Sequence, residues 1–264
     1  MIFVDRIDAL GRILTRILRH MATELRLNMR GDGFVKVEDL LNLNLKTCAN
    51  IQLNSHTIDE IREAVTRDNK KRFSLIDEDG ELLIRANQGH SITTVESDKL
   101  LKPILSPEEA PVCVHGTYRK NLESILASGL KRMNRMHVHF SCGLPTDGEV
   151  ISGVRRNVNV IIFLHIKKAL EDGIAFYISD NKVILTQGIV GVLPVDYFQK
   201  IESWPDRQTL VKNIRMPSRL IFPLAAALLW FSKSLTPSRF PVSEDAAMCG
   251  SDIEAKTVNQ CGRW

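Results

Sequence analysis

The stretch RFSLIDEDGELLIRA, residues 72–86, decides the first half of the fold. Apolar and polar residues alternate on both sides of Asp79-Gly80, and an Asp-Gly pair between two such runs is a strong signal for a β-hairpin. Just upstream, TIDEIREAVTRDN at residues 57–69 has helical periodicity, with Thr57 and Glu60 at capping-box spacing. The sequence therefore predicts a helix followed directly by a hairpin.

Further upstream, the chain begins with an amphipathic pattern. Apolar residues recur at helical spacing: Ile7, Leu10, Ile13, Leu14, Ile17 and Leu18. Asp5, Arg6 and Asp8 and the lack of a small-residue cleavage site argue against a secretory signal. Gly31-Asp32-Gly33 then predicts a turn, residues 34–37 a strand, and the acidic pair after them a helix start. This order of elements predicts a winged-helix-like lobe over residues 1–102.

Downstream of the hairpin, Pro103, Pro107 and Pro111 interrupt the pattern and predict a domain boundary. Residues 111–203 are strand-rich, with a helix at 121–130 ended by Gly129. The β-favouring runs are VCVHGT (112–117), HVHFS (137–141), NVIIFLHI (159–166), AFYIS (175–179), KVILT (182–186) and GVLPVDYF (191–198). The predicted class is α+β, with two lobes and a cleft between them; residues 204–264 form a tail of unassigned role.

Composition narrows the class of protein. A chain of 264 residues with 44% hydrophobic residues can bury a sizeable core. Its net charge of +4 is mild for a nucleic-acid binder, so the basic residues must be well placed rather than abundant. Five cysteines without CxxC spacing favour a reducing compartment over a disulfide framework or a zinc ribbon. The apolar run 220–231 contains Pro223 and is shorter than the roughly 18 residues of a membrane span, so none is expected.

Three groups of basic residues are candidates for a phosphate pocket. Arg19-His20 end the first predicted helix, Arg72 precedes the hairpin, and Arg155 follows Ser152-Gly153. Arginine binds a phosphate through a planar fork of donors, and histidine adds a donor that can be charged or neutral near pH 7. The plainer alternative is that these are solvated surface charges, with His20 stabilising the end of its helix.

Two further motifs suggest a cleft. His115-Gly116-Thr117 ends a predicted strand, and a glycine lets a flat ring or an amide approach the backbone closely. No GxGxxG follows a strand, so a doubly wound dinucleotide site is not indicated. His137 and His139 lie on one face of a strand, but no further ligand is clearly spaced for zinc. A hydrogen-bonding or stacking role is therefore favoured for the two imidazoles.

Read together, eight ordered blocks closely resemble the RNA 2′-phosphotransferase family of tRNA splicing, over about residues 10–200. They are LTRILRH (14–20), RGDGFVKVEDLL (30–41), DNKKRFSL (68–75), LIRANQGHS (83–91), VCVHGT (112–117), ILASGLKRMNRMHVHFS (125–141), ISGVRR (151–156) and DGIAFYISDNKVILTQG (172–188). The resemblance implies an RNA-binding winged-helix-like lobe joined to an ADP-ribosyltransferase-like β-rich lobe. It also implies an intracellular transferase of the cytoplasm or nucleus that acts on 2′-phosphorylated tRNA, with NAD as co-substrate, no metal and no obligate protein partner.

The family's catalytic tetrad is carried over onto Arg19, His20, Arg72 and Arg155. Its NAD site is carried over onto residues of the second lobe: His115, Gly116, Thr117, Asn181, and His137 or His139 as second histidine. In the implied reaction the RNA phosphate displaces nicotinamide from NAD, and a ribose hydroxyl then releases the RNA, giving ADP-ribose 1″,2″-cyclic phosphate. Two positions depart from the family: His165 replaces Asp, and Val154 replaces Met.

Two other functions compete with this interpretation. The first is an ADP-ribosyltransferase that modifies nucleic-acid ends or protein with the same NAD cleft. The second is an RNA-binding module without enzymatic activity, which the N-terminal lobe alone would support. The fate of the phosphate separates them, because only the transfer reaction yields dephosphorylated RNA.

Overall fold

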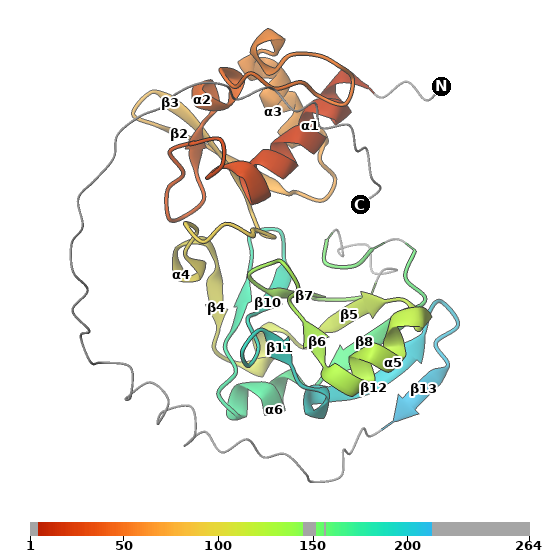
Figure 1. Ribbon diagram of the computed structural model, residues 1–264. Helices are drawn as coiled ribbons and strands as arrows, with labels where there is room; N and C mark the ends of the chain where they lie inside the picture. The colour runs from red at the N-terminus through yellow and green to blue at the C-terminus, as the bar shows by residue number, and fades with distance from the viewer. Residues whose placement is uncertain (1–4, 145–151, 156, 213–264) are drawn as a thin grey trace, which may run out of the picture. The chain divides into compact units, whose positions relative to one another are not determined.

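The computed structural model describes residues 5–144, 152–155 and 157–212. This part of the chain contains helices and two larger antiparallel sheets (Figure 1), which confirms the predicted α+β class. The described residues form one compact unit. Among the described residues, no helix combines the length and the apolar character that a bilayer crossing requires. The run 220–231 lies outside the described residues, as do Arg156, Cys249 and Cys261.

The first group of elements contains the predicted helices and hairpin. Helix α1 spans Arg6–Arg16 and continues as a π turn, η1, over Ile17–Met21. Helix α3 spans Ile58–Arg67 and begins with the predicted capping box of Thr57 and Glu60. The other elements are β1 (Val35–Lys36), α2 (Val37–Leu41), η2 (Leu53–Ser55), β2 (Phe73–Glu78) and β3 (Glu81–Ala86), and the strands form a sheet of order β1-β3-β2.

The hairpin between β2 and β3 forms as predicted. Asp79 and Gly80 have φ angles of 54° and 79°, the pair of positive values that a type I′ turn requires. The predicted strand 34–37 is shorter than expected, because Val37 already belongs to α2. Val37 and Leu40 lie one helical turn apart and are both buried, so a helix places both in the core where a strand would not.

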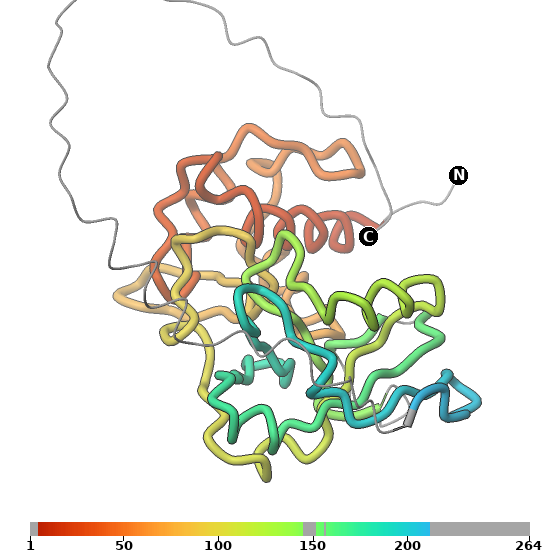
Figure 2. The backbone as a smooth tube through the Cα atoms, turned by 60° about the horizontal axis from the view of Figure 1, so that its bottom comes forward, coloured from red at the N-terminus to blue at the C-terminus, as the bar shows by residue number. Residues whose placement is uncertain are grey.

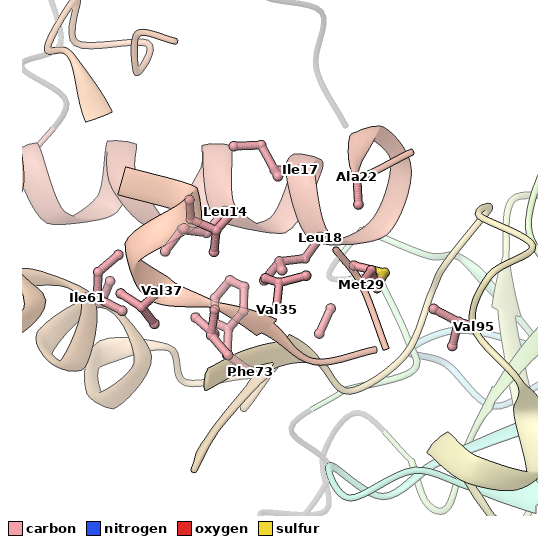
Figure 3. Packing of buried hydrophobic residues seen from close by; sticks show 14 of the residues in the cluster. Leu14, Ile17, Leu18, Ala22, Met29, Val35, Val37, Ile61, Phe73 and Val95 are labelled. Carbon is pink, nitrogen blue, oxygen red and sulfur yellow. The ribbon is translucent and has the colours of Figure 1, made fainter. Parts of the chain in front are cut away.

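The first core packs α1 and α3 against the small sheet. Figure 3 shows Leu14 of α1 and Leu18 of η1 beside Val35 and Phe73, with Ile61 of α3 at one side. The same cluster includes Val183 and Leu185, which belong to a strand of the larger sheet. The first group of elements is therefore fastened to the larger sheet by shared apolar packing.

The larger sheet has eight strands in the order β13-β12-β8-β5-β7-β10-β9-β4, with antiparallel neighbours. Helices α5 (Arg119–Ser128) and α6 (Ile166–Glu171) contribute apolar residues to its core. The strands are β4 (Lys102–Ile104), β5 (Val114–Thr117), β7 (Val138–Ser141), β8 (Val160–Leu164), β9 (Phe176–Ile178), β10 (Val183–Thr186), β12 (Phe198–Ser203) and β13 (Thr209–Lys212). Smaller elements are α4 (Ser97–Leu100), η3 (Pro107–Glu109), β6 (Leu130–Lys131), β11 (Val192–Leu193) and η4 (Val195–Tyr197).

Three segments in this half of the chain differ from the sequence prediction. Strand β4 lies in the proline-interrupted segment; Pro103 is accommodated because β4 is an edge strand with one side unpaired. Strand β13 lies in the stretch assigned to a patternless tail, and it pairs with β12. The run 191–198 is not one strand, because Pro194 separates β11 from the short helix η4.

The segment that joins the two groups of elements passes through the centre of this unit. Residues 87–101 follow β3 and reach β4 through α4, and they are drawn in yellow in Figure 2. Met136 N–H donates to His90 O at 3.0 Å, so this segment also bonds the chain just before β7. Residues 87–91 therefore lie between η1 and β7, where the candidate site is found.

Candidate active site

Arg19 is a buried cation with unused donors. The π turn widens the end of the first helix and directs this side chain inward, so that the residue is only 9% exposed. Its Nε and Nη2 atoms make no hydrogen bond to the described residues. Burial, together with the charges of Arg135 and Arg72, lowers the pKa of Arg19 to about 9. A buried guanidinium with unpaired N–H groups is costly unless an anion binds there.

His20 stands next to Arg19 and is held from one side. Its Nδ1 lies 2.9 Å from Ser91 Oγ, and Ser91 N–H donates to Arg19 O at 2.9 Å. Desolvation lowers the pKa of His20, followed by the charges of Arg19 and Arg135. The exposed imidazole is therefore neutral at pH 7, with one ring nitrogen occupied by Ser91 and the other, Nε2, left for a ligand.

Two further arginines complete a cationic cluster, defined here as Arg19, His20, Arg72 and Arg135. Arg72 is paired with the nearly buried carboxylate of Asp68. Arg135 lies within electrostatic reach of Arg19 and His20, since its charge lowers the pKa of both. Arg135 is exposed at the surface, and its own pKa is lowered by desolvation and by the charge of Arg155. The cluster thus gathers cations from three segments that are distant in sequence.

Arg135 is a further cation near the site that the sequence prediction did not include, and Arg155 was predicted as the fourth residue of the tetrad. Arg155 is exposed, and its charge acts on Arg135 and on His115. The charges that shift the pKa of Arg19 come from Arg135, Arg72 and Asp68. The structure therefore brings Arg19, His20 and Arg72 together with Arg135 and puts Arg155 at the side of Arg135. The sequence signal for Arg135 was its position two residues before His137, and Arg132 lies only three residues further upstream.

The two histidines of the HVH motif have different partners. His139 Nε2 lies 2.8 Å from Gln88 Oε1, and His137 Nε2 lies 3.0 Å from Ser97 Oγ. His139 also lies within reach of Arg135 and Arg19, whose charges join burial in lowering its pKa. Burial, followed by the charge of Arg132, lowers the pKa of His137 to about 4. His139 is the histidine that borders the cationic cluster, and both imidazoles are neutral at pH 7.

The HGT motif lies on β5 beside β7. His115 Nδ1 lies 2.8 Å from His139 O, so this ring nitrogen donates to the carbonyl, and burial lowers the pKa of His115. Thr117 is buried. A Cβ on Gly116 would meet Val154 Cγ1 at 2.5 Å. The close approach that the glycine permits is therefore used by Val154, which seats the segment of Arg155 against the sheet.

Asn181 and His165 have structural contacts of their own. Asn181 is buried; its Nδ2 donates to Lys70 O at 3.0 Å and its Oδ1 accepts from Ser179 Oγ at 2.8 Å. It therefore links the turn before β10 to the segment that carries Arg72. His165 is the N-cap of α6, where its Nδ1 accepts from Lys168 N–H at 3.3 Å. Aspartate is a favoured N-cap, so the imidazole replaces the carboxylate as a capping acceptor.

The chemical character of the site follows from these groups. Three arginines of the cluster are held near neutral histidines, and Asp68 is the carboxylate among the charges that act on Arg19. Across the described part of the chain, no three His, Cys, Asp or Glu side chains are grouped so as to hold a metal ion. The arrangement suits a multiply charged anion whose oxygens accept from several guanidinium donors.

Comparison with known proteins gives one consistent result. The chain matches the family model described as "RNA 2'-phosphotransferase, Tpt1 / KptA family" over residues 5–188. It is similar to tRNA 2'-phosphotransferase 1 of Danio rerio, with 40% identity over 73% of this chain and 84% of that protein. For tRNA 2'-phosphotransferase 1 of Mus musculus the identity is 42%, over 78% and 81% of the two chains. For the probable RNA 2'-phosphotransferase of Acaryochloris marina it is 35%, over 75% and 99%.

Proposed function

This chain belongs to the RNA 2'-phosphotransferase, Tpt1 / KptA family, and we propose that its cationic cluster holds the 2′-phosphate of a spliced tRNA. As a family member it is a transferase that removes a 2′-phosphate from RNA in tRNA splicing. The observation that carries the proposal is Arg19, buried at 9% exposure with two donors unused and two further arginines within electrostatic reach.

A bound phosphate would reverse the electrostatics of this cluster. Its oxygens would accept from Arg19 Nε and Nη2, and its negative charge would offset the repulsion among Arg19, Arg72 and Arg135. Opposite charge nearby favours the protonated form of a base, so the lowered pKa of His20 would rise when phosphate binds. The site would then take up a proton with its substrate.

NAD is the proposed co-substrate, bound beside β5 and β7. When bound, it supplies the ADP-ribosyl group that receives the phosphate and loses nicotinamide. His115 and His139 are neutral at pH 7 and would hydrogen-bond uncharged parts of the dinucleotide. The unused donors of Arg19 suit a phosphate-bearing ligand. The proposed contact residues are His115, Gly116, Thr117, His137, His139 and Asn181.

The residues of the cluster would divide the work of the reaction. Arg19 and Arg135 would neutralise the non-bridging oxygens as phosphorus is attacked, which is the main electrostatic demand of phosphoryl transfer. Arg72, fixed by Asp68, would orient the phosphate. His20, held at Nδ1 by Ser91, would protonate or orient the departing 2′-oxygen of the RNA through Nε2. Arg155 would contact the substrate from the edge of the cluster, beside Arg135.

The two groups of elements would serve different parts of the substrate. We propose that residues 1–102 form the winged-helix-like RNA-binding lobe and residues 111–203 the ADP-ribosyltransferase-like NAD lobe. The helices and small three-stranded sheet of the first and the extended antiparallel sheet of the second support this division. Action on tRNA with NAD would place the enzyme in the cytoplasm or nucleus, with no further protein needed.

The decisive experiment is one incubation of the full chain with a 2′-phosphorylated oligoribonucleotide and NAD. Equal amounts of dephosphorylated RNA, nicotinamide and ADP-ribose 1″,2″-cyclic phosphate are expected. The same oligonucleotide without its 2′-phosphate serves as control and should release no nicotinamide. A stable ADP-ribosyl adduct as sole product would instead show an ADP-ribosyltransferase, and RNA binding without nicotinamide release would show a binding module.

A further inference from the structure

Two cysteines face each other across the centre of the larger sheet. Cys113 comes directly before β5, and Cys142 comes directly after β7. The two strands are antiparallel, with Val114 opposite Ser141. In an antiparallel pair, stepping back one residue on one strand corresponds to stepping forward one on the other. Cys113 therefore stands opposite Cys142.

The hydrogen bonds show which kind of pair this is. Leu164 N–H, from β8 on the other side of β5, donates to Cys113 O at 2.9 Å. The N–H and C=O of one strand residue point to the same side, so Cys113 directs no backbone bond toward β7. It occupies a non-hydrogen-bonded position, where facing Cα atoms are roughly 4.5 Å apart. A disulfide spans Cα separations of roughly 4.4–6.8 Å.

The two side chains also lie on the same face of the sheet. Cys113 is 3% exposed in the core that contains Val138 and Phe140 of β7, and Cys142 packs against that core. Residues 138, 140 and 142 share one face by strand alternation, and His139 and Ser141 point to the other. Burial raises the pKa of the Cys113 thiol, and the neighbouring Cys142 raises it further. Strand position and sheet face both place the two sulfurs next to each other.

We propose that Cys113 and Cys142, both thiols in this structure, form a redox-active pair that a peroxide converts to a cross-strand disulfide. Cys142 is the more accessible of the two and would react first, losing its proton and taking one oxygen: R–SH + H₂O₂ gives R–SOH + H₂O. Cys113 then attacks that sulfur, so that R–SOH + R′–SH gives R–S–S–R′ + H₂O. A dithiol reductant reverses the change.

The bond would fasten the two strands that carry the proposed NAD-binding residues, a consequence that rests on the proposed function. Strand β5 carries His115, Gly116 and Thr117, and β7 carries His139. Ser141 Oγ also donates to Ser152 O at 3.2 Å, which ties β7 to the segment of Arg155. Closing the disulfide would restrict movement of β5 against β7 at the edge of the site, and we expect slower turnover with NAD.

The test uses the full folded chain, treated with hydrogen peroxide and then alkylated, digested without reductant and analysed by mass spectrometry. We expect loss of two hydrogens, a linked pair of peptides containing Cys113 and Cys142, and release by dithiothreitol. Cys48→Ser, a change at an exposed cysteine, should leave the linkage intact, and Cys142→Ser should abolish it and leave Cys113 reduced. Two outcomes would overturn the proposal. In one, Cys142 is oxidised to sulfinic acid and Cys113 stays unmodified; in the other, Cys113 is linked to another cysteine.

A second measurement separates this pair from the proposed function. A native cross-strand bond closes a loop in the unfolded chain, so peroxide should raise Tm by several degrees in the wild type and leave Tm of Cys142→Ser unchanged. A fall in Tm on linkage would show that the bond does not fit the native sheet. Peptide mapping and the Tm measurement do not depend on enzymatic activity. The disulfide proposal can therefore fail while the 2′-phosphotransferase assay succeeds, and the reverse.

Discussion

Ser91 Oγ lies 2.9 Å from His20 Nδ1, and the backbone N–H of the same serine donates to Arg19 O at 2.9 Å. One residue from the segment after β3 thus fixes both the imidazole and the backbone of the neighbouring arginine. The hydroxyl occupies Nδ1, so Nε2 is the ring nitrogen that we propose contacts the substrate. Ser91 is a positioning residue in this arrangement.

Replacing Ser91 with alanine should therefore lower kcat by roughly 10- to 100-fold with little change in KM, because the imidazole loses its orientation and the RNA contacts remain. The acid limb of the pH–rate profile should move with the altered His20 environment. Steady-state kinetics across pH test this. Ser128→Ala on α5, a matched change at a partly exposed serine, should have wild-type kinetics. An unchanged kcat in Ser91→Ala would remove Ser91 from the mechanism.

Arg19→Met should abolish turnover, by roughly 100-fold or more, and yet leave the fold as stable as the wild type or more so. The change removes a buried cation whose two nitrogens have no partner among the described residues. Inorganic phosphate should raise Tm of the wild type but not of the variant. Thermal unfolding with and without phosphate checks both statements. A strongly lowered Tm in the variant would show that Arg19 stabilises the fold itself.

Arg135→Ala should reduce turnover more than Arg155→Ala, because Arg135 acts on Arg19 and His20, and Arg155 acts on Arg135 and His115. We expect roughly 100-fold or more for the first and a smaller loss for the second. Arg62→Ala, which removes an exposed arginine on α3, controls for the change in net charge. The reverse order of effects would return Arg155 to the centre of the site.

Gly116→Ala should destabilise the chain and slow turnover, because the new Cβ would meet Val154 Cγ1 at 2.5 Å and Val158 Cγ1 at 3.0 Å. Overpacking of this kind costs about 1–3 kcal/mol. Val154→Ala removes the nearer methyl group, so the double variant should recover part of the loss. A double-mutant cycle on the free energy of unfolding measures this coupling, and strict additivity would contradict it.

Stability should fall as the pH drops below about 6.5, because His90 is buried and neutral. Burial, aided first by the charge of Arg19, lowers its pKa to about 3 in the folded chain, whereas the unfolded chain titrates near 6.5. Between these values only the unfolded state takes up the proton, so the contribution is complete above pH 6.5 and decreases toward pH 3. Linkage gives about 3 kcal/mol between pH 6.5 and 4.

Urea unfolding of the wild type and of His90→Gln at pH 7.5 and 4.5 measures this slope. The glutamine variant should lose less stability over the same interval, because it removes one proton that the unfolded state would bind. His137, with its pKa lowered to about 4, contributes the same sign of slope in both proteins. Equal slopes would show that His90 does not control acid stability.

Local patterns decided much of the secondary structure. The Asp79-Gly80 hairpin, the Thr57 cap and the end of α5 at Gly129 depend on backbone preferences of a few adjacent residues, so they could be predicted from the sequence. Strands β4 and β13 could not, because each is stabilised by a neighbour distant in the chain: β9 for the first and β12 for the second. A proline or a polar composition hides such strands from local analysis.

The sequence by itself determined the family and the α+β class and supplied Arg19, His20, Arg72 and Arg155 as candidates, since ordered blocks and local periodicity are written along the chain. Only the tertiary structure decided how Arg135 and Arg155 lie relative to the other three residues. Arg135 and Arg155 both follow plausible motifs, and their separation from Arg19 in space depends on how η1, residues 87–91 and β7 pack together. Charges act through distance in space, which sequence order does not record.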